Sequence, residues 1–202
     1  MPPDRIHTVT DKMVRDASSI VNVAIVAPTT VGGISASTEH PTPLMLPDLV
    51  AGVKKISSGF TVFNGNNIQG HVHVKDIAAI NIALLADALK GAANSDSRLW
   101  GPQAYYFANS EELTFAEYMK VLVELLKQKG IVTTNEMKVI GIGHGFAGEH
   151  SDWSAVIVHM YAVNMRCESE RAKRLLNWTP KGKLLSESLP AALDLFLERG
   201  RH

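Results

Sequence analysis

The segment from Val21 to Gly33 constrains the fold more than any other part of this sequence. From Val21 to Ala27 almost every side chain is apolar and four are β-branched, which is typical of a strand covered on both faces in a parallel sheet. Pro28 ends this composition, and two threonines and two glycines follow it. In open α/β sheets, ligands bind just beyond the carboxyl ends of the strands. We therefore predict a buried strand over 21–27 and a ligand site in the loop after it.

The composition is typical of a soluble globular protein. With 202 residues and 46% hydrophobic content, the chain can bury a core without disulfides or a metal. Its formal net charge is zero, which disfavours nucleic acid and anionic membranes as partners. The single cysteine, Cys167, excludes an internal disulfide framework and fits a reducing compartment as a packed thiol. We expect one domain over 1–202 in a cytoplasmic protein, with no signal peptide and no membrane span.

Apolar periodicity and turn residues predict the other elements. Helices are expected over 4–17, 47–55, 153–162, 168–176 and 186–198, and strands over 60–63, 71–74 and 103–108. The asparagines and glycine at 64–67 predict a turn, so the strands on either side of it are expected to form a hairpin. Asp76 is predicted to cap a helix that Gly91 ends. Thr114 and Glu117 have the spacing of a capping box at the start of another helix.

Two further patterns each allow a chemical and a structural interpretation. Residues 143–148 match G-x-G-x-x-G, but a dinucleotide fingerprint needs a following helix, a second strand and an acid about 20 residues on. Only 54 residues remain and they look helical, which favours a glycine-rich loop. Arg166 could hold an anionic substrate group, and the alternative is a solvated or ion-paired arginine.

A pair of histidines raises the alternative of metal-dependent hydrolysis. His71 and His73 are two apart, so on a strand they point to the same side and could bind one metal ion. His144, His150 and Asp152 could complete the ligand shell. Histidines on strands more often pack or form hydrogen bonds, so we predict no metal site.

Three stretches in order resemble the NAD(P)-dependent epimerase/dehydratase family, the extended group of short-chain dehydrogenases/reductases. Residues 24–33 resemble the family's Arg-Pro-x-x-Val-Tyr-Gly segment. Residues 71–78 (His-Val-His-Val-Lys-Asp-Ile-Ala) resemble its Val-His-Val-x-Asp-Val-Ala segment. Residues 171–180 (Arg-Ala-Lys-Arg-Leu-Leu-Asn-Trp-Thr-Pro) resemble its terminal Arg-Ala-x-x-x-Leu-Gly-Trp-x-Pro. The ordered set covers nearly the whole chain.

The chain departs from that family in several places. Ala27, Gly32 and Asn177 stand where the family has arginine, tyrosine and glycine. The family's N-terminal strand with its glycine-rich pyrophosphate loop is absent, as is its Tyr-x-x-x-Lys pair, which would fall just upstream of Met1. The resemblance therefore implies an α/β fold with a partial Rossmann-like, doubly wound sheet. That sheet lacks its N-terminal βαβ half and is followed by a C-terminal helical substrate cap.

The resemblance also implies a site and a chemistry. The residues implied for the nicotinamide end of NAD or NADP are Pro28, Thr29, Thr30 and Val31, and those for the substrate side are His71, His73 and Arg166. The family's chemistry is hydride transfer at a hydroxyl or carbonyl carbon of a small molecule. No catalytic residue is assigned, which leaves open whether this chain is itself an enzyme. The alternative is a non-catalytic truncated remnant or interaction module, whose exposed sheet edge another copy or a partner would cover.

Overall fold

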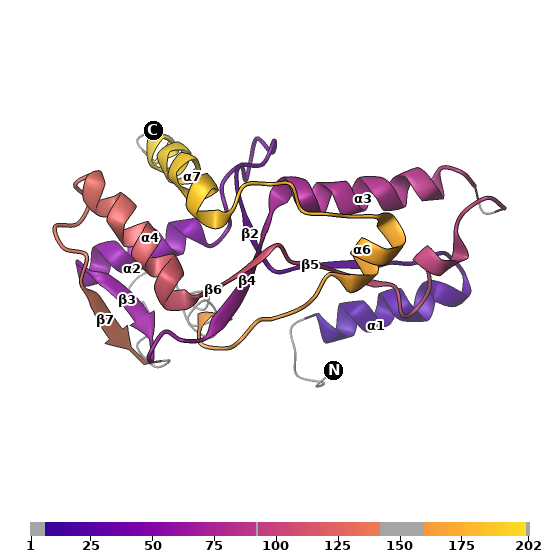
Figure 1. The fold of residues 1–202 in the computed structure, drawn as a ribbon, viewed down its shortest axis with the longest axis horizontal. Helices are drawn as coiled ribbons and strands as arrows, with labels where there is room; N and C mark the ends of the chain where they lie inside the picture. The colour runs from indigo at the N-terminus through magenta and orange to yellow at the C-terminus, as the bar shows by residue number, and fades with distance from the viewer. Residues whose placement is uncertain (1–6, 92, 142–159, 201–202) are drawn as a thin grey trace.

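The fold is built around a three-stranded sheet in the middle of the molecule. The computed structural model describes residues 7–91, 93–141 and 160–200. The sheet consists of β2 (Thr30–Gly32), β4 (Ile68–His73) and β6 (Glu111–Thr114), in that order. β4 pairs with β2 in parallel and with β6 antiparallel. Figure 1 shows this sheet between two groups of helices and strands, which make the molecule elongated.

The first lobe contains β1, the strand that leads into the predicted ligand site. Its elements are α1 (Thr8–Asp16), β1 (Ile25–Pro28), α3 (Val74–Ala88), β5 (Tyr105–Ala108) and α6 (Glu170–Leu176), with 3₁₀ turns at Ala17–Ser19 and Ser97–Leu99. β1 pairs in parallel with β5, and Figure 1 shows α3 and α1 on opposite sides of this pair. Tyr106, Ile80 and Trp178 belong to its core. The lobe is thus a two-stranded parallel sheet with helices on both sides.

The second lobe has a separate hydrophobic core. Its elements are α2 (Leu46–Ile56), β3 (Gly59–Val62), α4 (Phe115–Gln128), β7 (Met137–Ile140) and α7 (Leu185–Arg199). β3 pairs in parallel with β7, so the predicted helical cap also contains a strand pair. The helices α4 and α7 pack together around Met119, Leu122 and Leu193, all of which are fully buried.

Helix α4 begins where its sequence predicts. The Thr114 hydroxyl accepts a hydrogen bond from the backbone N–H of Glu117 (3.2 Å), and the Glu117 carboxylate accepts one from the backbone N–H of Thr114 (2.7 Å). These bonds satisfy N–H groups that the first turn of a helix leaves unpaired. Phe115 and Leu126 lie on the predicted apolar face and are fully buried. Both the capping box and that face are confirmed.

The segment from Val21 to Gly33 differs in detail from its prediction. The strand begins at Ile25 rather than at Val21, and it is half-buried, with Pro28 exposed, rather than covered on both faces. The residues after it, predicted as a loop, include strand β2. The local composition could not reveal β2, because that strand depends on β4, which lies about forty positions further along the chain.

The predicted hairpin is wrong. β3 and β4 flank the turn but lie in different sheets, where β3 pairs with β7 and β4 pairs with β2 and β6. β4 is central in its sheet and almost fully buried. Local turn chemistry predicted the wrong partner because β3 and β4 each pair with strands that lie far away along the chain.

The other expected elements are mostly in place. Helices α1, α2, α6 and α7 and strand β5 match their predicted ranges to within a few residues. The motif at 143–148 and most of the predicted helix 153–162 lie outside the described residues. Within the described ranges, no helix is both long enough and apolar enough to cross a membrane.

Candidate functional site

The residues predicted for the nicotinamide end lie at the junction of β1 and β2. The Thr29 hydroxyl donates a hydrogen bond to the backbone oxygen of Ala108 (3.0 Å), so this buried threonine holds the end of β1 against the end of β5. Thr30 and Val31 are half-buried in β2, and Pro28 is exposed. The surface that these residues offer is therefore mainly apolar side chain and backbone.

A row of three side chains crosses the central sheet. Thr30 on β2 is directly opposite His71 on β4, which in turn is opposite Glu111 on β6. Paired residues on neighbouring strands project from the same face, so the row brings a predicted cofactor residue next to a predicted substrate residue. Glu111 accepts a hydrogen bond from the backbone N–H of Leu185 (2.6 Å), which places this face toward the second lobe.

His71 is the most perturbed group in that row. It is only 2% exposed, and neither ring nitrogen has a hydrogen-bond partner. Burial lowers the pKa of His71 from 6.5 to about 4, because the charged imidazolium loses its hydration there. Burial also raises the pKa of Glu111. In both residues, burial thus favours the uncharged form of the side chain.

His73 has a structural contact of its own. It is the N-cap of α3, and its Nδ1 accepts a hydrogen bond from the backbone N–H of Lys75 (3.2 Å). A Cβ at Gly33 would lie 2.2 Å from His73 Nε2, and Gly33 has a φ of 84°, so this position requires glycine. Within the described residues, no group of three His, Cys, Asp or Glu could hold a metal ion, and His144, His150 and Asp152 lie outside those residues.

Arg166 lies on the opposite face of the sheet from His71. Its guanidinium pairs with Glu112 (2.8 Å between Nη2 and Oε2) and is largely exposed. Glu112 follows Glu111 on β6, and successive side chains on a strand point to opposite faces. The structure thus brings His71 next to Thr30 but does not bring Arg166 to the same face. The ion pair is the structural interpretation that the sequence left open for Arg166.

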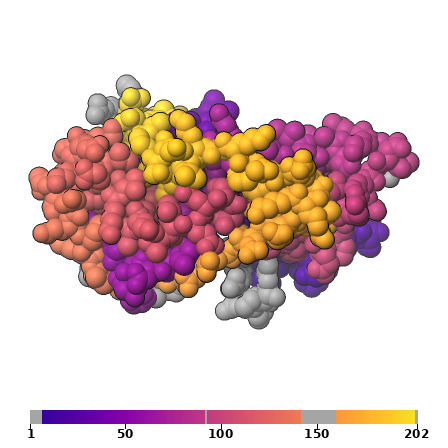
Figure 2. Space-filling model, in the orientation of Figure 1, coloured from indigo at the N-terminus to yellow at the C-terminus, as the bar shows by residue number. Residues whose placement is uncertain are grey.

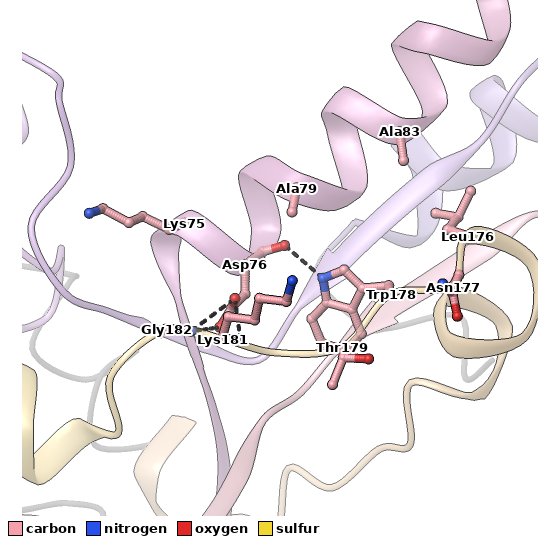
Figure 3. A pocket seen from close by; sticks show the side chains of 10 residues that line it. All are labelled: Lys75, Asp76, Ala79, Ala83, Leu176, Asn177, Trp178, Thr179, Lys181 and Gly182. Atoms are coloured by element: carbon pink, nitrogen blue, oxygen red, sulfur yellow. Dashed lines mark hydrogen bonds between the residues drawn. The ribbon is translucent and has the colours of Figure 1, made fainter.

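Asp76 does not cap α3, so that prediction is wrong. Its carboxylate accepts hydrogen bonds from the backbone N–H groups of Lys181 (2.8 Å) and Gly182 (3.0 and 3.1 Å), as Figure 3 shows. The Trp178 indole N–H donates to the backbone oxygen of Asp76 (3.0 Å). Figure 2 shows the segment after α6 crossing the surface between the lobes. Asp76 therefore anchors that crossing segment to α3.

An open cleft of ≈370 Å³ lies beside this anchor, between α3 and the crossing segment (Figure 3). Ala79 and Ala83 form part of its apolar wall, and Lys75 and Lys181 lie at its rim. None of the residues predicted for cofactor or substrate lines it. The cleft is therefore separate from the row that contains Thr30 and His71.

Several residues near His71 could not be predicted from the sequence. Tyr118 on α4 packs edge-on against it, with ring centroids 5.5 Å apart. Tyr161 packs near Tyr118, and Gln69 precedes His71 on the same face of β4. The sequence carries no signal for these contacts, because they join residues far apart in the chain. His71 and Tyr118 are 47 positions apart, and Gln69 and Val163, which share a hydrogen bond, are 94 positions apart.

Comparison with known proteins identifies the fold. No protein-family model matches the sequence. A relative named Oxidase ucsJ, from Acremonium sp, is 23% identical over 139 residues, which are 67% of this chain and 38% of the relative. DesIV from Streptomyces venezuelae, a dTDP-glucose 4,6-dehydratase with NAD and TYD bound, superposes with a TM-score of 0.59 at 15% identity, over 94% of this chain and 48% of its own.

A second solved structure gives the same result. UDP-glucose 4-epimerase from Thermotoga maritima, with UDP-glucose, superposes with a TM-score of 0.57 at 14% identity, over 95% of this chain and 52% of its own. The chain thus spans about half the length of these enzymes and less of the curated relative. Its fold is that of about half of a Rossmann-like epimerase or dehydratase, consistent with the C-terminal half. The predicted fold class is confirmed.

Proposed function

We propose that this chain belongs to an NAD(P)-dependent oxidoreductase, epimerase or dehydratase acting at a hydroxyl or carbonyl carbon of a small molecule. In this proposal the chain supplies mainly the substrate-binding half. The observation that carries the proposal is the superposition of nearly the whole chain on enzymes of that kind, one of which was solved with NAD. The row from Thr30 to His71 supports it, because predicted cofactor and substrate residues are neighbours there.

The residues present fit one end of the cofactor. Thr30 and Val31 are only half-buried and Pro28 is exposed, so these residues can contact a flat nicotinamide ring through apolar side chain and backbone. When bound, the nicotinamide supplies hydride transfer. In the described residues no glycine-rich turn joins a strand to a helix in a way that would bind the pyrophosphate; α3 follows β4 directly, with His73 as its N-cap. The fit is therefore limited to the nicotinamide end.

Fragments of the cofactor give a sharp test of this limited fit. We expect NADH or NADPH, and reduced nicotinamide mononucleotide, to stabilise the purified chain against thermal unfolding, whereas AMP should not. A ligand at 100 times its Kd should add about 2.7 kcal/mol to the free energy of unfolding. The absence of any shift at millimolar NADH and NADPH would contradict cofactor binding by this chain. Stabilisation by AMP alone would contradict the assigned end.

A second candidate function, an interaction module, is favoured by apolar surface around β1. In the described part of the chain, β1 pairs with β5 along one edge, and no strand pairs with the other edge of β1. On α3 and its C-cap Leu89, a stripe of three side chains is exposed: Ile82 (65%), Leu85 (59%) and Leu89 (78%). On α1, Val9 and Met13 are 73% and 68% exposed. A second copy or a partner that covers this surface would bury apolar groups now in water.

Charged substitution in the α3 stripe tests this second candidate. We expect the wild-type chain to self-associate with increasing concentration in light scattering, and Leu85→Glu to reduce that association. The matched control is Ala51→Glu, which places the same charge at an exposed position on α2 and should change nothing. A monomer at all concentrations, or equal effects of the two substitutions, would remove self-association through this stripe.

A further inference from the structure

One face of β4 carries buried polar atoms that the fold leaves without partners. Gln69 and His71 are two positions apart on this strand, so both side chains project from the same face. They are 1% and 2% exposed. Gln69 Oε1 and both ring nitrogens of His71 have no hydrogen-bond partner. Since buried polar groups in folded proteins are almost always hydrogen-bonded, such a group indicates a missing partner.

A third orphaned group belongs to Tyr161, which is linked to His71 through the ring of Tyr118; Gln69, His71 and Tyr161 are called the cluster below. The Tyr161 hydroxyl is buried and has no partner, and its ring lies 6.3 Å from that of Tyr118, which packs edge-on against His71. The Gln69 side-chain N–H groups donate to the backbone oxygens of Met160 (3.3 Å) and Val163 (2.5 Å). These two bonds hold the segment that carries Tyr161 beside β4.

The cluster is connected to the predicted nicotinamide end. Thr30 is the neighbour of His71 on the adjacent strand and shares its face. Thr30 is half-buried, whereas His71 is almost completely buried, so the row runs from the surface into the interior. A ligand that reaches the cluster from this side would pass the residues predicted to contact the cofactor.

The hydrogen-bonding capacity of the cluster defines the ligand. The free Gln69 oxygen accepts, one nitrogen of a neutral imidazole accepts while the other donates, and a tyrosine hydroxyl does both. No cation is among these residues, and the Glu111 carboxylate flanks them, which disfavours an anion. Burial disfavours any charged group that lacks a close counter-ion. A hydroxyl group can donate to the Gln69 oxygen and accept from His71 and Tyr161 without charge. A carbonyl oxygen can accept from His71 and Tyr161 but cannot pair with Gln69 Oε1.

We propose that Gln69, His71 and Tyr161 form a hydrogen-bonding subsite for an uncharged, hydroxyl-bearing part of the substrate, entered from the Thr30 side. This inference rests on the proposed function and deepens it, since it names the chemistry of the substrate. Binding at the subsite itself requires no cofactor, so it can be measured separately.

A charge series of small probes of equal size tests the subsite. Propane-1,2-diol, lactate and 1-aminopropan-2-ol are neutral, anionic and cationic near pH 7, and each would be titrated into the full chain while the ring nitrogens of His71 are followed by NMR. We expect the diol to shift these resonances and to bind at least fivefold more tightly than either charged probe. If the diol shifts no resonance, water is the only occupant of the cluster and the proposal is overturned. A preference for either charged probe would also overturn it.

Two tyrosine substitutions locate the binding. Tyr161→Phe removes an orphaned hydroxyl, so it should weaken diol binding at least fivefold without lowering the Tm. The matched control is Tyr105→Phe, whose hydroxyl lies in the first lobe against Asp11 (3.3 Å) and which should leave diol binding unchanged. Unchanged diol binding in Tyr161→Phe, or a lowered Tm, would overturn the proposal.

The two sets of measurements fail independently. Loss of the cofactor effect with diol binding intact would remove the proposed function and leave the subsite. Loss of diol binding with the cofactor effect intact would remove the subsite alone.

Discussion

Replacing Asp76 by alanine is expected to lower the free energy of unfolding by about 3 kcal/mol, because backbone N–H groups at Lys181 and Gly182 lose a charged acceptor. Asp76 is only 4% exposed, so water can replace the carboxylate only at a cost. The bonds tie the segment between α6 and α7 to the start of α3, and their loss should loosen the connection between the two lobes. Urea unfolding monitored by tryptophan fluorescence measures the change.

An exposed aspartate provides the control for this substitution. Asp194 pairs with Lys129 on the surface and is 54% exposed, so Asp194→Ala should cost less than about 1 kcal/mol. The loss of unfolding free energy in Asp76→Asn should lie between those of Asp76→Ala and Asp194→Ala, since an amide keeps one acceptor oxygen but loses the charge. Equal losses for Asp76→Ala and Asp194→Ala would mean that Asp76 does not anchor the crossing segment.

Acidification is expected to destabilise the protein through His71. The pKa of His71 is about 4 in the folded chain and 6.5 when it is exposed by unfolding. Below pH 6.5 the unfolded chain therefore binds more protons, and stability falls as the pH is lowered through this window and levels off near pH 4. The total loss is about 3 kcal/mol, because each pH unit between the two pKa values is worth ~1.4 kcal/mol.

His71→Phe separates this effect from that of other titrating groups. It keeps an aromatic ring against Tyr118 but cannot be protonated, so its free energy of unfolding should fall less between pH 6.5 and pH 4 than that of the wild type. His73, whose pKa burial also lowers, acts in the same direction and remains in both proteins. Urea unfolding at four or five pH values gives the two curves. Parallel curves would mean that His71 is not held neutral by the fold.

The fold brings together only some of the residues predicted for the site. Thr30 and His71 were predicted for different halves of a site, and their adjacency on β2 and β4 agrees with that prediction without testing its chemistry. Arg166 was grouped with His71 because the resemblance implies that both lie on the substrate side, but Arg166 pairs with Glu112 on the other face of the sheet. Sequence order along a chain carries no information about which face of a sheet a distant side chain occupies.

Local patterns in the sequence determined the helices and the ordered motifs. The capping box at Thr114 and the apolar face of α4 required only residues within a few turns of one another, since a helix satisfies its own backbone hydrogen bonds. Tertiary structure alone decided the partners of β3 and β4, the anchoring role of Asp76 and the unpaired nitrogens of His71. These features depend on segments that are far apart in the chain. The segments come into contact only when their apolar side chains are buried in the two hydrophobic cores.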